Sequence, residues 1–271
     1  MRESHSSNDG FSLTEVLLAV GTIAVGMLFI AGVFPVGIHF TTIASERTIA
    51  AVVADEAFAK IRLYAAGNPI DANDDINFGP LRIDQLTDYT QTVAINPVEF
   101  SYPSDPNMDI TLKQYYWSAL CRLTEPHIDP NDPRRLVQVT VFVGRKVGAG
   151  AVYWYRDPVS PPALITVPSP VPVWLDVSQP VGFNPDSLLV SDAAPADGVN
   201  EVAFVNDRYT IVDNMSGQIY RVLERDKAMP DMIVLDRPWQ GGTTGSVWVV
   251  PPPMGGGRGP CIAIYQRVIR F

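Results

Sequence analysis

Residues Gly10 to Ala44 read GFSLTEVLLAVGTIAVGMLFIAGVFPVGIHFTTIA, a long and almost uninterrupted apolar segment near the start of the chain. From Val16 to Ala44 no side chain carries a fixed charge, and only His39 can gain one. A helix crosses the hydrocarbon core of a bilayer with ~20 mostly apolar residues, so this stretch is long enough to span it. The sequence therefore predicts a membrane helix with one carboxylate, Glu15, at its front edge.

A short polar leader, MRESHSSNDG, precedes the apolar stretch. An ordinary secretory signal is cleaved behind its apolar segment, after small residues. Here the candidate junction, Gly10–Phe11, lies in front of the apolar segment, so cleavage would leave the helix on the mature chain. Arg2 is the only basic residue before the helix and Arg47 follows soon after it, so the Lys and Arg count barely orients the chain across a membrane.

The order Gly10, Phe11 and then Glu15, the fifth residue of the processed chain, resembles the class III signal of type IV prepilins and type II secretion pseudopilins. The run from Glu15 to Val20, followed by Ala24 to Leu28, is most similar to PilV-like and GspI-like minor members. This resemblance extends to about residue 55. It implies a prepilin peptidase that cuts after Gly10 and methylates Phe11. It also implies a single-pass inner-membrane protein with its leader in the cytoplasm and its C-terminal region outside.

Two roles are open for Glu15. Ser12 and Glu15 have the spacing of a capping box, in which the carboxylate caps the start of the helix. In a filament, Glu15 would instead pair with the new amino terminus of Phe11 on a neighbouring subunit. A carboxylate deep in hydrocarbon costs at least ~2.5 kcal/mol, which such an ion pair would offset. With Gly10 and Phe11 in front of it we favour the assembly role, and the two roles are compatible.

The helix is predicted to continue to Ala66, before the stop signal Gly67-Asn68-Pro69. Its second half has an apolar stripe near the helical period, formed by Ile49, Val52, Val53, Phe58, Ile61 and Tyr64. Within the membrane segment, Pro35 interrupts the backbone hydrogen bonding, which predicts a kink or a short unwound stretch. Pro35 either kinks the helix without functional consequence or, as the resemblance implies, marks a point where the helices of packed subunits unwind.

Composition constrains the region after the helix. The formal charge of −9 argues against nonspecific nucleic-acid binding, which relies on Lys and Arg. The 24 Pro and 20 Gly predict a turn-rich region. We expect an α+β, pilin-like fold in which the long N-terminal helix packs on an antiparallel β-sheet and an all-β region follows. The predicted segments are the leader 1–10, the helix 11–66 (in the membrane to about residue 44), the β head 67–156, a Pro-rich connector 157–173 and a small β domain 174–271.

Strand patterns support this division. The head contains candidate strands at Thr90–Ile95, Gln114–Leu123 and Arg135–Arg145. Short candidates follow the connector, a spacing typical of a small antiparallel barrel or sandwich: Trp174–Val177, Glu201–Val205, Tyr209–Asp213, Gln218–Leu223, Met232–Leu235, Ser246–Val250 and Ile262–Phe271. The last strand either belongs to this region or returns to the first sheet.

No residue pattern indicates catalysis, a metal site or a cofactor. His5, His39 and His127 lack the spacing of a metal site or a triad. The run Asp71 to Asp75 has oxygen ligands at alternate positions, but it lacks the glycine and terminal Glu of a calcium loop, so a solvated acidic loop is the preferred interpretation. Cys121 and Cys261 either form a disulfide or are two separately buried thiols, which is the outcome we favour.

The resemblance implies a structural subunit without an active site. Its expected partners are other pilin or pseudopilin subunits, a prepilin peptidase/methyltransferase and membrane lipid, and no nucleic acid. The alternative class is a monomeric, membrane-anchored module whose acidic β region binds a ligand at the cell envelope. A membrane-anchored hydrolase has no supporting group of residues.

Overall fold

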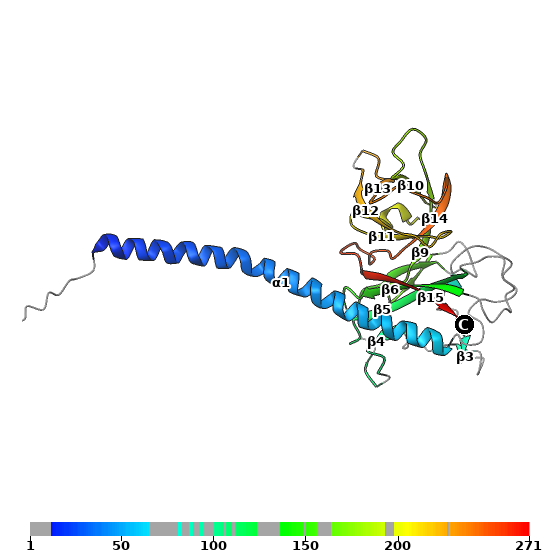
Figure 1. Ribbon diagram of the computed structural model, residues 1–271, viewed down its shortest axis with the longest axis horizontal. Coiled ribbons are helices and arrows are strands. Elements are labelled where there is room, and N and C mark those ends of the chain that lie inside the picture. The colour runs from blue at the N-terminus through cyan, green and yellow to red at the C-terminus, as the bar shows by residue number, and fades with distance from the viewer. Residues whose placement is uncertain are drawn as a thin grey trace, which may run out of the picture. The chain divides into compact units, whose positions relative to one another are not determined.

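The computed structural model describes residues 12–64, 81–82, 87–88, 93–94, 100–105, 107–109, 112–123, 136–148, 150–156, 164–192, 198–226 and 228–270. The chain divides into two compact units, residues 1–48 and residues 49–271. One long helix and a series of β-strands make up the described residues, which confirms the α+β class (Figure 1).

The helix α1 runs from Leu13 to Tyr64. In the described residues it is the one helix whose length and composition would allow it to cross a membrane. Its apolar part has no charged residue between Glu15 and Glu46. The predicted stop signal at Gly67-Asn68-Pro69 lies outside the described residues.

The second unit contains an antiparallel sheet in the order β1-β5-β6-β15, with β4 also paired to β5. These strands are β1 (Leu81–Arg82), β4 (Ser101–Tyr102), β5 (Tyr115–Leu123), β6 (Leu136–Arg145) and β15 (Cys261–Arg270). The two strongest strand predictions are thus confirmed to within one residue at each end. Two short pairs complete this part of the chain: β2 (Thr87–Asp88) with β3 (Val93–Ala94), and β7 (Tyr153–Arg156) with β8 (Leu164–Val167). The predicted connector therefore contains a paired strand, β8.

The part of α1 that belongs to the second unit packs on one face of this sheet. Its buried residues recur at three- and four-residue steps: Ala50, Val53, Ala54, Ala57, Phe58 and Ile61. They meet the valines at alternate positions of β6, from Val137 to Val143. The predicted stripe needs one correction, because Val52 is 49 % exposed. At about 100° per residue, position 52 turns away from the face that positions 50, 53 and 57 share, and small alanines complete that face instead.

The strands after β8 form a closed antiparallel barrel in the order β10-β13-β12-β11-β14-β9. They are β9 (Val173–Ser178), β10 (Ser187–Ser191), β11 (Thr210–Asp213), β12 (Ile219–Arg225), β13 (Met232–Leu235) and β14 (Thr244–Val249). Their buried side chains form one apolar cluster that fills the barrel. Leu175, Leu188 and Tyr220 of this cluster are fully buried.

Two details of the barrel differ from the sequence prediction. The candidate strand Glu201–Val205 is instead a 3₁₀-helix, η4 (Glu201–Phe204). The Asn200 side chain accepts a hydrogen bond from the Val202 amide at 3.1 Å, which favours a helical turn over an extended strand. Conversely, β10 was not predicted, because its Leu-Leu-Val run is short and does not alternate with polar residues.

The barrel is inserted between two strands of the sheet. Its first and last strands, β9 and β14, pair along their whole length, from Val173 opposite Val249 to Ser178 opposite Thr244. The chain then returns to the sheet through β15, which pairs with β6 from Cys261 opposite Gly144 to Arg270 opposite Leu136. The sheet face that does not meet α1 is also covered, since Leu120 and Phe142 pack with Val212, Trp248 and Val250.

Limited proteolysis tests this topology. We expect a protease to cut the full chain between Asp157 and Trp174, where prolines are dense. The two fragments should nevertheless co-elute under native conditions in detergent, because β15 of the second fragment pairs along β6 of the first. They should separate only in denaturant. Fragments that separate without denaturant would contradict the pairing of β15 with β6, and a connector that resists while other loops are cut would argue against a domain boundary there.

Candidate functional site

Glu15, the residue for which the sequence predicts a role in assembly, lies at the start of α1. Glu15 lies in the first helical turn, where a carboxylate interacts favourably with the helix dipole. The Ser12 carbonyl oxygen accepts hydrogen bonds from the Glu15 amide at 3.0 Å and from the Val16 amide at 3.2 Å. Gly10 and Phe11, the two residues of the predicted processing site, lie outside the described residues.

The Glu15 side chain is exposed. Across residues 12–64 it makes no ion pair and no side-chain hydrogen bond, so the reciprocal side-chain contacts of a capping box are not formed with Ser12. The first turn is closed by backbone hydrogen bonds instead. The carboxylate is therefore oriented by the helix and open to a cationic group from outside this segment.

The helix behind Glu15 is apolar on all sides. Between Leu13 and Phe40 its large apolar side chains are all more than half exposed. A helix without a polar face is typical of a segment surrounded by lipid or by other apolar helices. The Thr22 hydroxyl finds its partners within the helix, since it donates to the carbonyl oxygens of Leu18 and Ala19.

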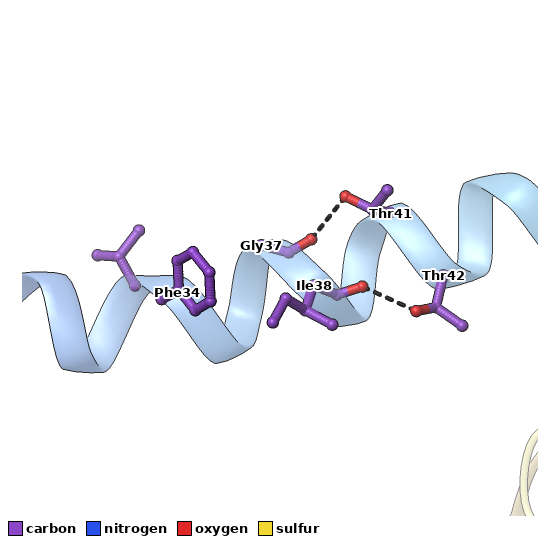
Figure 2. A pocket seen from close by; sticks show the side chains of 6 residues that line it. Phe34, Gly37, Ile38, Thr41 and Thr42 are labelled. Atoms are coloured by element: carbon purple, nitrogen blue, oxygen red, sulfur yellow. Dashed lines mark hydrogen bonds between the residues drawn. The ribbon is translucent and has the colours of Figure 1, made fainter.

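Pro35 lies inside α1, and the helix continues unbroken on both sides of it, so the structure contains no unwound stretch there. Proline has no amide hydrogen, so the helical bond to the carbonyl of Ala31 is missing. Two helical turns further on, Thr41 donates to the Gly37 carbonyl and Thr42 to the Ile38 carbonyl, both at 2.9 Å (Figure 2). These residues line a shallow, open hollow on one side of the helix together with Val33 and Phe34. Its threonines need no polar partner from another chain.

The two cysteines are free, so the disulfide alternative is not formed. Cys121 belongs to the cluster between α1 and the sheet, whereas Cys261 lies against the cluster on the opposite face. A disulfide is therefore excluded in this fold, because the sheet itself separates the two thiols. Burial raises the pKa of each thiol to about 12.

The raised pKa values predict slow thiol chemistry. At pH 8 only about one thiol in 10⁴ would be ionised, and the thiolate is the reactive form. We expect an alkylating reagent at pH 8 to leave Cys121 and Cys261 unmodified in the folded chain, and to modify both after denaturation. Mass spectrometry of the intact protein measures this. Rapid modification of Cys261 in the folded chain would show that its thiol is not held against the apolar cluster.

Other candidate positions give no site. No group of three or more His, Cys, Asp or Glu residues that could hold a metal ion occurs in the part of the chain that the structure describes. The acidic run Asp71 to Asp75, together with His5 and His127, lies outside that part. The aromatic residues Trp117 and Tyr153 are core residues, exposed by 4 % and 0 %.

No family model, curated protein or solved structure matches this chain. Its function must therefore be inferred from its residues and their contacts.

Proposed function

We propose that this chain is a structural subunit of the minor pilin or pseudopilin type, which co-assembles through its N-terminal helix into a type IV pilus or a type II secretion pseudopilus. The observation that carries this proposal is the position of Glu15. It is the only charged residue in the first thirty residues of an otherwise apolar helix, and it stands five positions after Gly10.

The packing of α1 supports a pilin-like arrangement. Its second half is anchored to a β-sheet through six buried residues, while its first half exposes apolar side chains. A subunit built this way can contribute its apolar half to a shared bundle without unfolding its β region. The anchoring includes Arg267 of β15, whose guanidinium pairs with Asp55 and lies 4.5 Å from the centre of the Phe58 ring.

In this proposal, other proteins carry out the chemical modification of the chain. A prepilin peptidase would cut after Gly10, and its methyltransferase activity would modify the amine of Phe11. The C-terminal sheet and barrel would then lie outside the cytoplasm. The partners are other pilin-like subunits and membrane lipid, and neither a cofactor nor nucleic acid takes part.

Processing provides the direct test. N-terminal sequencing and mass spectrometry of the chain purified from its native membrane should find a methylated Phe11 as the first residue. A chain that begins at Met1, or one cut behind the apolar segment, would remove the pilin-type proposal. A Gly10→Leu variant is the matched control, since it should insert in the membrane but remain uncut.

A membrane-anchored binding module is the second candidate. The acidic composition of the chain and its closed barrel favour it, because such a barrel presents loops on a rigid scaffold. In that case α1 is a plain anchor and Glu15 has no partner on another subunit. Recovery of other pilin-like subunits with the chain distinguishes the two candidates.

A further inference from the structure

The turn between β11 and β12 carries a sequence pattern that the proposed function does not use. Residues 214–216 read Asn-Met-Ser. Of all the asparagines in the chain, only Asn214 is followed by a residue other than proline and then by Ser or Thr. This pattern is the acceptor sequence for a sugar on an asparagine side chain, and it is expected in a surface loop of an exported region. Because short patterns also occur by chance, the structural setting of Asn214 decides whether it can serve as a site.

The turn has a fixed shape and lies at the surface. The Asp213 side chain accepts hydrogen bonds from the amides of Met215 at 3.2 Å and Ser216 at 2.9 Å, and also from the Ser216 hydroxyl. Gly217 has a positive φ of 69°, which glycine adopts without strain, and its amide donates to the Asp213 carbonyl oxygen at 2.9 Å. Met215 and Ser216 are exposed, and Asn214 is half-buried. The acceptor pattern therefore lies in an ordered surface turn.

The Asn214 side chain has a defined orientation. Its Oδ1 accepts a hydrogen bond from Nε1 of Trp248 at 2.7 Å. An indole nitrogen can only donate, so the atom that faces it is the amide oxygen and not the amide nitrogen. Trp248 is held in the apolar cluster between the barrel and the sheet, where it is 7 % exposed. The Asn214 Nδ2, the atom to which a sugar is linked, is thus on the branch of the amide away from the indole, and it has no hydrogen-bond partner among the described residues.

A sugar on Nδ2 is compatible with these contacts. The linkage replaces one of the two hydrogens on the amide nitrogen and leaves the amide oxygen as an acceptor, so the hydrogen bond from Trp248 persists. The Asn214 backbone is also held, because its amide donates to the Ser246 carbonyl oxygen at 2.9 Å. The barrel therefore needs no rearrangement to carry a sugar at this position.

We propose that Asn214 is an N-glycosylation site, which accepts a sugar from a lipid-linked donor outside the cytoplasm. This inference rests on the location of the C-terminal region in the proposed function. In the transfer, Nδ2 attacks the anomeric carbon of a sugar carried by a polyprenyl diphosphate. A bond forms between that carbon and Nδ2, the bond from the carbon to the diphosphate oxygen breaks, and the lipid diphosphate leaves with the bonding electrons. The amide nitrogen gives up one proton to a base of the oligosaccharyltransferase.

Mass spectrometry of the full chain purified from its native membrane tests this site. Trypsin cuts after Arg208 and Arg221, and we expect the peptide between them to be heavier than its sequence by whole sugar residues. A peptide N-glycosidase should remove this increment and leave Asp at position 214. A peptide with an unmodified Asn214 would overturn the proposal.

Matched variants separate the acceptor group from the fold. Asn214→Asp keeps an oxygen for Trp248 but has no amide nitrogen, so it should lose the sugar and retain the near-UV circular dichroism of the native chain. Ser216→Thr keeps the hydroxyl of the pattern and should retain the sugar, whereas Ser216→Ala should lose it. Asn206→Asp is the control outside the pattern and should leave the sugar in place. An increment that persists in Asn214→Asp or Ser216→Ala would contradict the proposal.

The same spectra distinguish this inference from the proposed function. A chain that begins at a methylated Phe11 but carries an unmodified Asn214 would overturn the glycosylation site and leave the pilin-type function intact. A chain that begins at Met1 and carries a sugar on Asn214 would remove the pilin-type function and support the site.

Discussion

A Glu15→Gln chain is expected to insert in the membrane and to be cleaved normally, yet to lose its pilin-like partners. The substitution removes one charge and leaves size and polarity nearly unchanged. If Glu15 pairs with the amino terminus of a neighbouring subunit, the substitution leaves that amine without its carboxylate partner in a poorly solvated environment. Losing one member of such a pair costs about 3–5 kcal/mol, which corresponds to a loss of partner binding of at least 100-fold.

Co-purification measures this effect. Wild-type and Glu15→Gln chains are compared at matched membrane levels, and the recovery of other pilin-like subunits is quantified. An Arg47→Gln chain provides the control, because it removes one exposed charge that lies beyond the apolar stretch of the same helix. Equal recovery of partners with all three chains would show that Glu15 has no role in assembly.

A Gly241→Ala chain is expected to lose much of the stability of its barrel. A Cβ atom at position 241 would lie 2.2 Å from Cζ2 of Trp239, much closer than any allowed contact. The indole cannot move away cheaply, because its Nε1 donates to the Gly242 carbonyl at 2.9 Å and its ring lies 5.1 Å from that of Tyr220. Displacing a buried tryptophan from its cluster costs about 3–5 kcal/mol.

Chemical denaturation of the full chain in detergent, followed by near-UV circular dichroism, measures this loss. Gly148→Ala is the matched control, because no heavy atom lies within 4 Å of the Cβ that it adds. We expect the control to change the free energy of unfolding by no more than about 0.5 kcal/mol. Similar midpoints for the two variants would show that Trp239 does not lie over Gly241.

Some features follow from local sequence alone. The helix α1 is specified by an uncharged apolar stretch and by residues that recur at the helical period, and both are properties of neighbouring residues. The strands β5 and β6 are equally local, because β-branched and aromatic residues favour extended backbone wherever their partners lie. The candidate role of Glu15 likewise comes from its position relative to Gly10 and Phe11.

Other features depend on long-range packing. The short run of β10 becomes a strand because it closes the barrel, with Leu188 opposite Ile233 and Leu189 opposite Ser178. The composition of Glu201–Phe204 favours a strand. However, the Asn200 side chain accepts a hydrogen bond from the Val202 amide, and the segment forms a 3₁₀-helix. Val52 fits the apolar stripe that the sequence predicts, yet in the structure the neighbouring alanines pack against the sheet in its place.

Local patterns in the sequence specify a membrane-capable helix with a single carboxylate at its start, an antiparallel β region behind it and a turn-rich region of short strands. Three-dimensional packing, by contrast, determines that β15 returns to the first sheet and that the two cysteines lie on opposite faces of it. The physical reason is the range of the interactions. Helical periodicity and strand propensity act over a few residues, whereas strand order and loop contacts depend on which distant segments complete a sheet or close a barrel.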